Sequence, residues 1–282
     1  MFCIHHNDMD GNCSGAIVYS YHKKKGETVR CYSANHNIPV PLDKIKKDEK
    51  VYIVDFSLKE DIFNKLLEIT KDVIWIDHHK SAIEKFKDTE VGNLDGIRRV
   101  GDAGCELTWE HFYGKNSKMP TIVRMLGRYD VWDFSLYGMR ILNALQEFCK
   151  TVNTLPNSDI WEKWLDLDFS PKEELSDGAM YLQYRNSIWG NFLKSWGFDV
   201  DFEGYKAIAC NTANVSSEFF RNVHGKDYDI FMPFIYDGEN WVVSLYTLKD
   251  NIDCSKIAVK YGGGGHRKAA GFTTKNLPFI SK

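Results

Sequence analysis

The chain has 282 residues, a length that suits one large domain or two modest ones. Hydrophobic residues make up 43% of the chain, which is enough to build a sizeable core. The formal net charge of −3, from 36 basic and 39 acidic residues, argues against a protein that coats long nucleic acid by charge alone, but it allows a short anionic substrate in a local pocket.

Short apolar runs in the first 100 residues have the pattern of strands separated by helices. The predicted strands are 2–4, 29–32, 51–54 and 73–76, and the predicted helices are 12–25 and 58–70. Short apolar strands that alternate with helices indicate a parallel sheet, in which ligands bind at the carboxyl ends of the strands. Three of the four runs end in a polar cluster that contains aspartate, so we expect these clusters to converge.

The second part of the chain is first helical and then mixed. Helix-spaced apolar residues occur at 107–112, 122–129, 141–148, 160–165 and 180–192, strand-like runs at 206–210, 230–236 and 241–247, and a further helical segment at 254–261. We place a domain boundary near 196–203, which gives domains over 1–196 and 204–282. The tryptophans at 109, 132, 189 and 241 are treated as core residues.

The sequence shows neither a targeting signal nor a closely spaced pair of cysteines. No stretch approaches the roughly 18 apolar residues needed to span a membrane, and the N-terminus lacks the pattern of a signal peptide. The seven cysteines are scattered, odd in number and without CxxC spacing. Reduced thiols in a cytoplasmic protein are the simplest interpretation.

The aspartate and histidine clusters predict a metal centre. His6, Asp8 and Asp10 alternate, so on an extended strand end their side chains would share one face. Asp55, and Asp77 with His78 and His79, follow later strands. Carboxylate and imidazole donors suit divalent cations, and this set favours Mn²⁺ over Zn²⁺, with Mg²⁺ or Co²⁺ as substitutes. A lone Asp-Gly turn or a lone histidine would usually be a surface feature, but an Asp-His-His directly after an apolar strand is harder to explain that way.

A glycine run near the C-terminus predicts a binding segment for phosphate or substrate. Gly262–Gly265 lets backbone N–H groups approach an anion without an intervening Cβ. His266 and Arg267 follow and can donate to phosphate oxygens. A helix cap needs only one glycine, which favours the binding interpretation. The candidate substrate-binding residues are Gly263, Gly264, Gly265, His266 and Arg267.

Together these motifs resemble the DHH/DHHA1 phosphoesterases. The residues that carry the resemblance are His6-Asn7-Asp8-Met9-Asp10-Gly11, Asp55, Asp77-His78-His79, Asp130 and Gly262-Gly263-Gly264-Gly265-His266. The resemblance implies an α/β fold, with a parallel-sheet DHH domain and helical extension over 1–196, a smaller DHHA1 domain over 204–282, and the active site in the cleft between them.

The resemblance also implies roles for these residues. His6, Asp8 and Asp55 would hold one Mn²⁺, and Asp10, Asp55, His78 and Asp130 the other, with Asp55 bridging. Asp77 would orient His78, and His79 would lie near the scissile phosphate. Ser244-Leu245-Tyr246-Thr247 departs from the family's Ser-Leu-Arg-Ser, and Tyr246 cannot make an arginine's bidentate phosphate contact. It could stack on a base or be a core tyrosine.

The compact His-x-Asp-x-Asp motif and the chain length are most similar to the nano-RNase B-like branch. We therefore expect a Mn²⁺-dependent 3′–5′ oligoribonuclease that degrades short single-stranded RNA or DNA, with no membrane partner and with a homodimer possible. The alternatives are a pAp phosphatase, a cyclic mono- or dinucleotide phosphodiesterase, and a nucleotide-binding module that has lost catalysis.

Overall fold

The computed structural model describes residues 1–35, 38–213, 215, 219–220 and 227–279. The chain forms two compact units, Met1–Leu182 and Gln183–Lys282. The division falls inside the long helix α8 (Lys172–Trp196), so α8 contributes residues to both units. The predicted domain boundary near 196–203 stays a prediction.

The first unit contains the expected parallel sheet. Its strands are β1 (Phe2–His6), β2 (Arg30–Ala34), β3 (Val51–Val54) and β4 (Val73–Ile76), in the order β2-β1-β3-β4. All neighbouring pairs are parallel. The sequence predicted β3 and β4 with their exact bounds, whereas β1 extends two residues further and β2 lies slightly later in the chain. The parallel-sheet prediction is confirmed.

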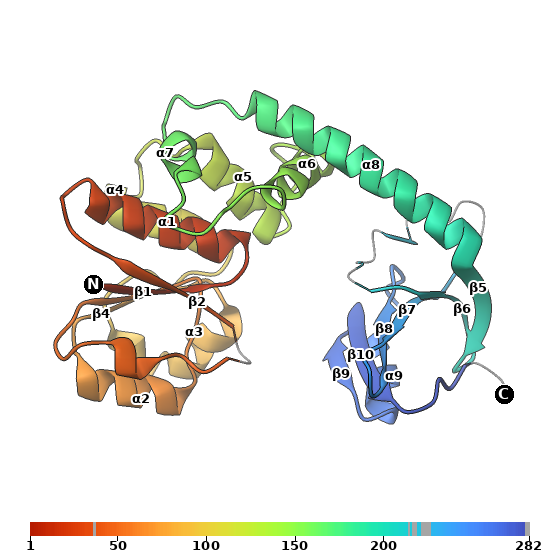
Figure 1. Ribbon diagram of the computed structural model, residues 1–282. Helices are drawn as coiled ribbons and strands as arrows, with labels where there is room; N and C mark the ends of the chain where they lie inside the picture. Colours follow the sequence, from red (N-terminus) through yellow and green to blue (C-terminus); the bar gives the residue numbers. More distant parts are fainter. Residues whose placement is uncertain (36–37, 214, 216–218, 221–226, 280–282) are drawn as a thin grey trace. The chain divides into compact units, whose positions relative to one another are not determined.

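Helices cover both faces of this sheet (Figure 1). Helices α1 (Met9–Lys23) and α4 (Gly104–Tyr113) lie on one face, where they bury the side chains of one alternating set of strand residues. Helices α2 (Glu60–Ile69) and α3 (Lys80–Phe86) cover the other set. The strands are buried on both faces, which is why their sequences are continuous apolar runs. Helix α3 was not predicted.

Three further helices pack around α1 and form the predicted helical extension. They are α5 (Thr121–Asp130), α6 (Met139–Cys149) and α7 (Ile160–Trp164). Trp161 and Trp164 are almost fully buried in this second core. Two short 3₁₀ helices, η1 (Leu42–Lys44) and η2 (Val91–Asn93), connect elements of the sheet layer.

In its described residues, the second unit contains the C-terminal part of α8, a mixed six-stranded sheet and helix α9 (Cys254–Lys260). Its strands, in the order β5-β6-β7-β8-β10-β9, are β5 (Gly197–Phe202), β6 (Tyr205–Asn211), β7 (Ile230–Tyr236), β8 (Trp241–Tyr246), β9 (Gly264–His266) and β10 (Ala269–Thr274). Helix α9 packs on the sheet. Strand β5 occupies the segment that we interpreted as a boundary. Within the described residues, none of the helices has the length and apolarity to cross a membrane.

Candidate metal centre

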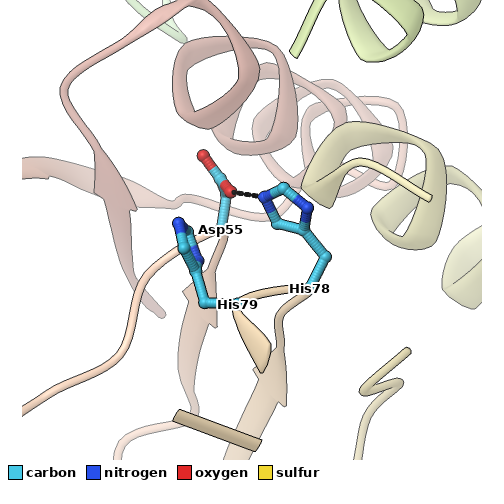
Figure 2. A group of neighbouring side chains, drawn as sticks. All are labelled: Asp55, His78 and His79. Atoms are coloured by element: carbon cyan, nitrogen blue, oxygen red, sulfur yellow. Dashed lines mark ion pairs between the residues drawn. The ribbon is translucent and has the colours of Figure 1, made fainter. Parts of the chain in front are cut away.

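The parallel sheet places three of the predicted aspartate and histidine clusters at one edge. His6 ends β1, Asp55 directly follows β3, and Asp77, His78 and His79 directly follow β4. Because β1, β3 and β4 are neighbouring parallel strands, their carboxyl ends lie side by side. Figure 2 shows Asp55, His78 and His79 at these strand ends, with the Asp55 carboxylate and the His78 ring directed toward one another.

Asp8 and Asp10 also lie in this cluster, but their backbone conformation differs from the predicted one. The chain is not extended there, because helix α1 begins at Met9. Asp8 is the N-cap of α1 and accepts a hydrogen bond of 2.8 Å from the Gly11 N–H. Asp10 lies in the first turn of α1 and is buried. The extended conformation expected for Asp8 and Asp10 was therefore wrong, although both carboxylates face the cluster.

Three overlapping groups of donor atoms can each hold a metal ion. They are His6 with Asp8 and Asp55, Asp10 with His78 and Asp130, and Asp55 with His78 and His79, and within each group the donor atoms lie within 4.8 Å of one another. His78 Nε2 lies 3.1 Å from Asp55 Oδ1 and 3.4 Å from Asp130 Oδ2. Asp130, which only the family resemblance indicated, is the last residue of α5 and lies in the same cluster. All predicted metal-binding residues thus come together.

Helix α4 supplies an anchor that the sequence did not reveal. The N–H groups of Gly104 and Cys105, at the start of α4, donate to the two oxygens of Asp10 at 2.7 and 2.8 Å. A helix N-terminus attracts negatively charged groups, so this contact fixes the position of the Asp10 side chain. A Cβ on Gly104 would lie 2.5 Å from the Asp55 Cβ, so only glycine lets α4 approach this closely. The glycine at the first position of the helix was the available signal.

The electrostatics of the cluster fit a bound cation. Burial and the nearby Asp10 and Asp8 carboxylates raise the pKa of Asp55 well above its usual value, and the same causes raise the pKa of Asp130 to about 7. Both oxygens of Asp55 are buried and accept no hydrogen bond from the described residues. Among these residues, only histidines lie within ion-pair distance of Asp8, Asp10, Asp55 and Asp130. A divalent cation would neutralise this excess of negative charge.

Asp77 contacts a different histidine from the one expected. Its Oδ1 lies 2.7 Å from His79 Nδ1, and it also accepts the backbone N–H groups of His78 and His79 at 2.8 and 3.1 Å. Asp77 therefore orients the ring of His79 and only the main chain of His78. The hydrogen bond to Asp77 raises the pKa of His79, whose side chain is 43% exposed and therefore accessible to a ligand.

The glycine run lies in the second unit and forms the end of α9 and strand β9. Gly262 has a φ of +77° directly after the helix, and a Cβ on Gly263 or Gly265 would meet β10 at 2.1 and 2.6 Å. A Cβ on Gly264, by contrast, would meet no atom within 4 Å. Backbone conformation therefore accounts for Gly262 and packing for Gly263 and Gly265, which leaves Gly264 without a structural reason.

The remaining candidates near the glycine run lie on the surface or pack within the unit. His266 is exposed, and the Arg267 guanidinium donates to the Asp250 carbonyl. Tyr246 packs against an apolar cluster and donates to the Val215 carbonyl, as a core tyrosine would. The binding roles of His266 and Arg267, and an active site in a cleft between the domains, stay predictions.

The expectation that four tryptophans are core residues was wrong for one of them. Trp109 is 4% exposed, and Trp189 and Trp241 pack against apolar clusters. Trp132 is 60% exposed.

Comparison with protein families gives a match over the part of the chain that builds the cluster. Residues 1–127 match the model of the DHH family, N-terminal domain. The matched segment contains β1 to β4 and every predicted metal-binding residue except Asp130.

Individual proteins are similar over longer stretches. The uncharacterized protein R106 of Acanthamoeba polyphaga mimivirus is 24% identical over 84% of this chain, which spans only 55% of that relative's length. The oligoribonuclease NrnB of Bacillus subtilis is 26% identical over 94% of this chain and 71% of its own. The pGpG-specific phosphodiesterase PggH of Vibrio cholerae has a similar fold, with a TM-score of 0.57 at 13% identity, covering 97% of this chain and 93% of its own.

The first prediction concerns the pH dependence of stability without metal. A carboxyl group whose pKa is raised from 3.8 to about 7 binds its proton more tightly in the folded state, so its contribution to stability is lost as the pH rises through this range. We expect EDTA-treated protein to be less stable at pH 8 than at pH 5, and Asp130→Asn to reduce the difference by about 2 kcal/mol.

Thermal denaturation between pH 5 and pH 8 measures this effect. Asp168→Asn is the control, because this exposed carboxylate has a lowered pKa and titrates below the range. If the stability of Asp130→Asn fell between pH 5 and pH 8 as steeply as that of the wild type, the prediction would be contradicted.

The second prediction concerns the close approach of α4. In Gly104→Ala the new Cβ must displace either α4 or Asp55, at a cost of about 1 to 3 kcal/mol. We expect a lower Tm and a smaller rise of Tm on addition of Mn²⁺. Gly190→Ala, at a helical position with nothing within 4 Å, is the matched control. Alanine is favoured over glycine in a helix by about 0.5 to 1 kcal/mol, so this variant should keep or slightly raise Tm and leave the rise on addition of Mn²⁺ unchanged.

Proposed function

We propose that this chain, whose residues 1–127 belong to the DHH family of phosphoesterases, hydrolyses short oligonucleotides from the 3′ end with the help of two Mn²⁺ ions. The observation that carries the proposal is the presence of overlapping donor groups, in which Asp55 and His78 are each shared. Shared donors suit two neighbouring cations, and two-metal centres hydrolyse phosphoesters. The oligoribonuclease name of the Bacillus subtilis relative, which matches 94% of the chain, supports the choice of substrate.

The donor set supports manganese. It contains aspartate oxygens and imidazole nitrogens, and no cysteine belongs to any of the three groups. Such donors suit Mn²⁺, with Mg²⁺ or Co²⁺ as substitutes, whereas structural Zn²⁺ sites are rich in cysteine. When bound, the ions would polarise the phosphoryl oxygens and activate a water molecule.

His79 is the residue that we propose for proton transfer. Asp77 binds its Nδ1, which leaves Nε2 available toward a ligand. The raised pKa of His79 increases the protonated fraction, so the ring can give a proton to the departing 3′-oxygen. Asp77 is nearly fully buried and holds the imidazole in one orientation.

In the second unit, we propose that Gly264 and His266 bind a phosphate of the substrate. Gly264 has open space where a Cβ would be, and His266 is exposed on the same short strand. Backbone N–H groups and an imidazole recognise a phosphate without regard to the base.

The compartment proposed is the cytoplasm, where short RNA is produced. All seven cysteines are free, and all but Cys31 are buried, which agrees with a reducing environment. A homodimer stays a prediction.

The proposed function is tested with purified protein, Mn²⁺ and RNA substrates of two to about 24 nucleotides. We expect complete conversion of the shortest substrates to mononucleotides and slow cleavage of the longest. Products read by chromatography with pGpG, pAp and c-di-AMP separate the alternatives, because preferential release of phosphate from pAp or linearisation of c-di-AMP would replace the oligoribonuclease proposal. Absence of turnover on every substrate would favour a binding module.

The third prediction tests the role of His266. His266→Ala should lower kcat/KM for a dinucleotide by about 10-fold or more, the effect of losing one hydrogen bond to a charged group. An activated phenyl phosphoester lacks the second phosphate group, so its hydrolysis should change far less. Lys256→Ala removes an exposed cation of α9 and serves as the control. Equal losses on both substrates would exclude a recognition role.

A further inference from the structure

Trp132 is an exposed tryptophan close to the candidate metal centre. Its side chain is 60% exposed, whereas Trp75, Trp161 and Trp164 are 1% exposed or less. A tryptophan usually buries most of its large apolar surface. Trp196 is also exposed, so what distinguishes Trp132 is its exposure together with its backbone conformation and its place beside the cluster.

The backbone at Trp132 is also in an unfavourable conformation. Its φ is +60°, a left-handed value that costs a residue with a bulky side chain of this kind stability that glycine or asparagine would retain. Strained residues of this kind cluster at functional sites. A tryptophan thus stands where neither burial nor backbone geometry favours one.

The turn that carries Trp132 is firmly braced. The Asp133 N–H donates to the Arg128 carbonyl at 2.8 Å, and the Asp133 carboxylate accepts hydrogen bonds from Arg128 and Ser135. The Arg128 guanidinium is bound in turn by buried Glu106. The indole and the Phe134 ring pack in a T-shaped arrangement, with 4.8 Å between ring centroids. One side of the indole is thus fixed while much of its surface stays open to solvent.

The position of Trp132 places it within reach of a substrate held at the cluster. Asp130, whose Oδ2 lies 3.4 Å from His78 Nε2, is two residues earlier in the chain. Two residues span at most about 7 Å between Cα atoms. The backbone of Trp132 therefore lies close to that of a residue of the cluster.

We propose that Trp132 is the stacking platform for a nucleobase of the bound substrate, an inference that rests on the proposed function. A rigid, exposed aromatic face binds any base, because every base has a π-face. Bracing by Asp133 and Phe134 lowers the entropy lost when the base stacks, which explains why the turn is so firmly held.

The test compares three substrates that differ only in their bases. They are the dinucleotide pApA and two analogues in which either the 5′ or the 3′ nucleoside is replaced by an abasic tetrahydrofuran residue. We expect Trp132→Ala to lower kcat/KM for pApA by about 10-fold, and to have little effect on the analogue that lacks the stacked base. Trp132→Phe keeps an aromatic face and should stay within about 3-fold of wild type. Trp196→Ala, at a tryptophan that is 66% exposed, is the matched control.

Binding of mononucleotides provides a readout that needs no turnover. Trp132→Ala should weaken binding of adenosine monophosphate but leave binding of ribose 5-phosphate unchanged, as measured by calorimetry with Mn²⁺. Equal losses on all three dinucleotides would show that Trp132 acts by packing, for example beneath another part of the chain, and would overturn the proposal. Unchanged activity on all three would also overturn it. Failure of wild-type protein to cleave any of them would instead reject the proposed function, and the binding comparison would still decide the role of Trp132.

Discussion

Repulsion among buried carboxylates is the constraint on which the architecture of the first unit depends. Most of these carboxylates are stabilised by backbone N–H groups. Asp8 accepts from Gly11, Asp10 from the start of α4, and Asp77 from the two residues that follow it. Asp55 is more than 98% buried and has no such donor among the described residues. Backbone dipoles therefore compensate most of the surrounding charges but not the central one, and a buried unpaired charge is very costly, which is the electrostatic basis for proposing a cation there.

Backbone strain is also concentrated at positions where the orientation of a side chain matters. Four non-glycine residues of the described chain have positive φ, and two of them, Asp48 and Glu203, lie in turns just before or between strands. The other two are Asp55 and Trp132, at +52° and +60°. The Asp55 side chain lies beside Gly104 at the start of α4. Positive φ is thus found both at the central candidate ligand and at the residue proposed to stack on a base, where precise orientation matters more than local stability.

The sequence predicted the parts of the site that follow from strand patterning. The bounds of β3 and β4 were read directly from four-residue apolar runs, so Asp55 and Asp77 could be placed at the correct edge. The prediction from the sequence failed where a local interaction, such as a helix cap, decides the backbone conformation. Asp8 acts as a helix cap, and this moves the start of α1 and turns an expected extended segment into a helix. Helix α3 carries little apolar periodicity, and β5 is an edge strand whose exposed residues resemble a linker. The contact between Gly104 and Asp55 joins residues far apart in sequence, and a glycine at the first position of α4 is the one local sign of it.

The recognition groups proposed in the two units share one property, which bears on the kind of substrate. An exposed indole, a glycine N–H group and an imidazole bind a base face or a phosphate, and none of them reads the hydrogen-bonding edge of a base. Sequence-specific recognition would require polar side chains directed at base edges. An enzyme with only face and phosphate contacts can accept any base but gains little from added length, because each further nucleotide needs a further platform. The proposed contacts in the two units suit short oligonucleotides of mixed sequence, a substrate class that the candidate metal centre alone leaves undetermined.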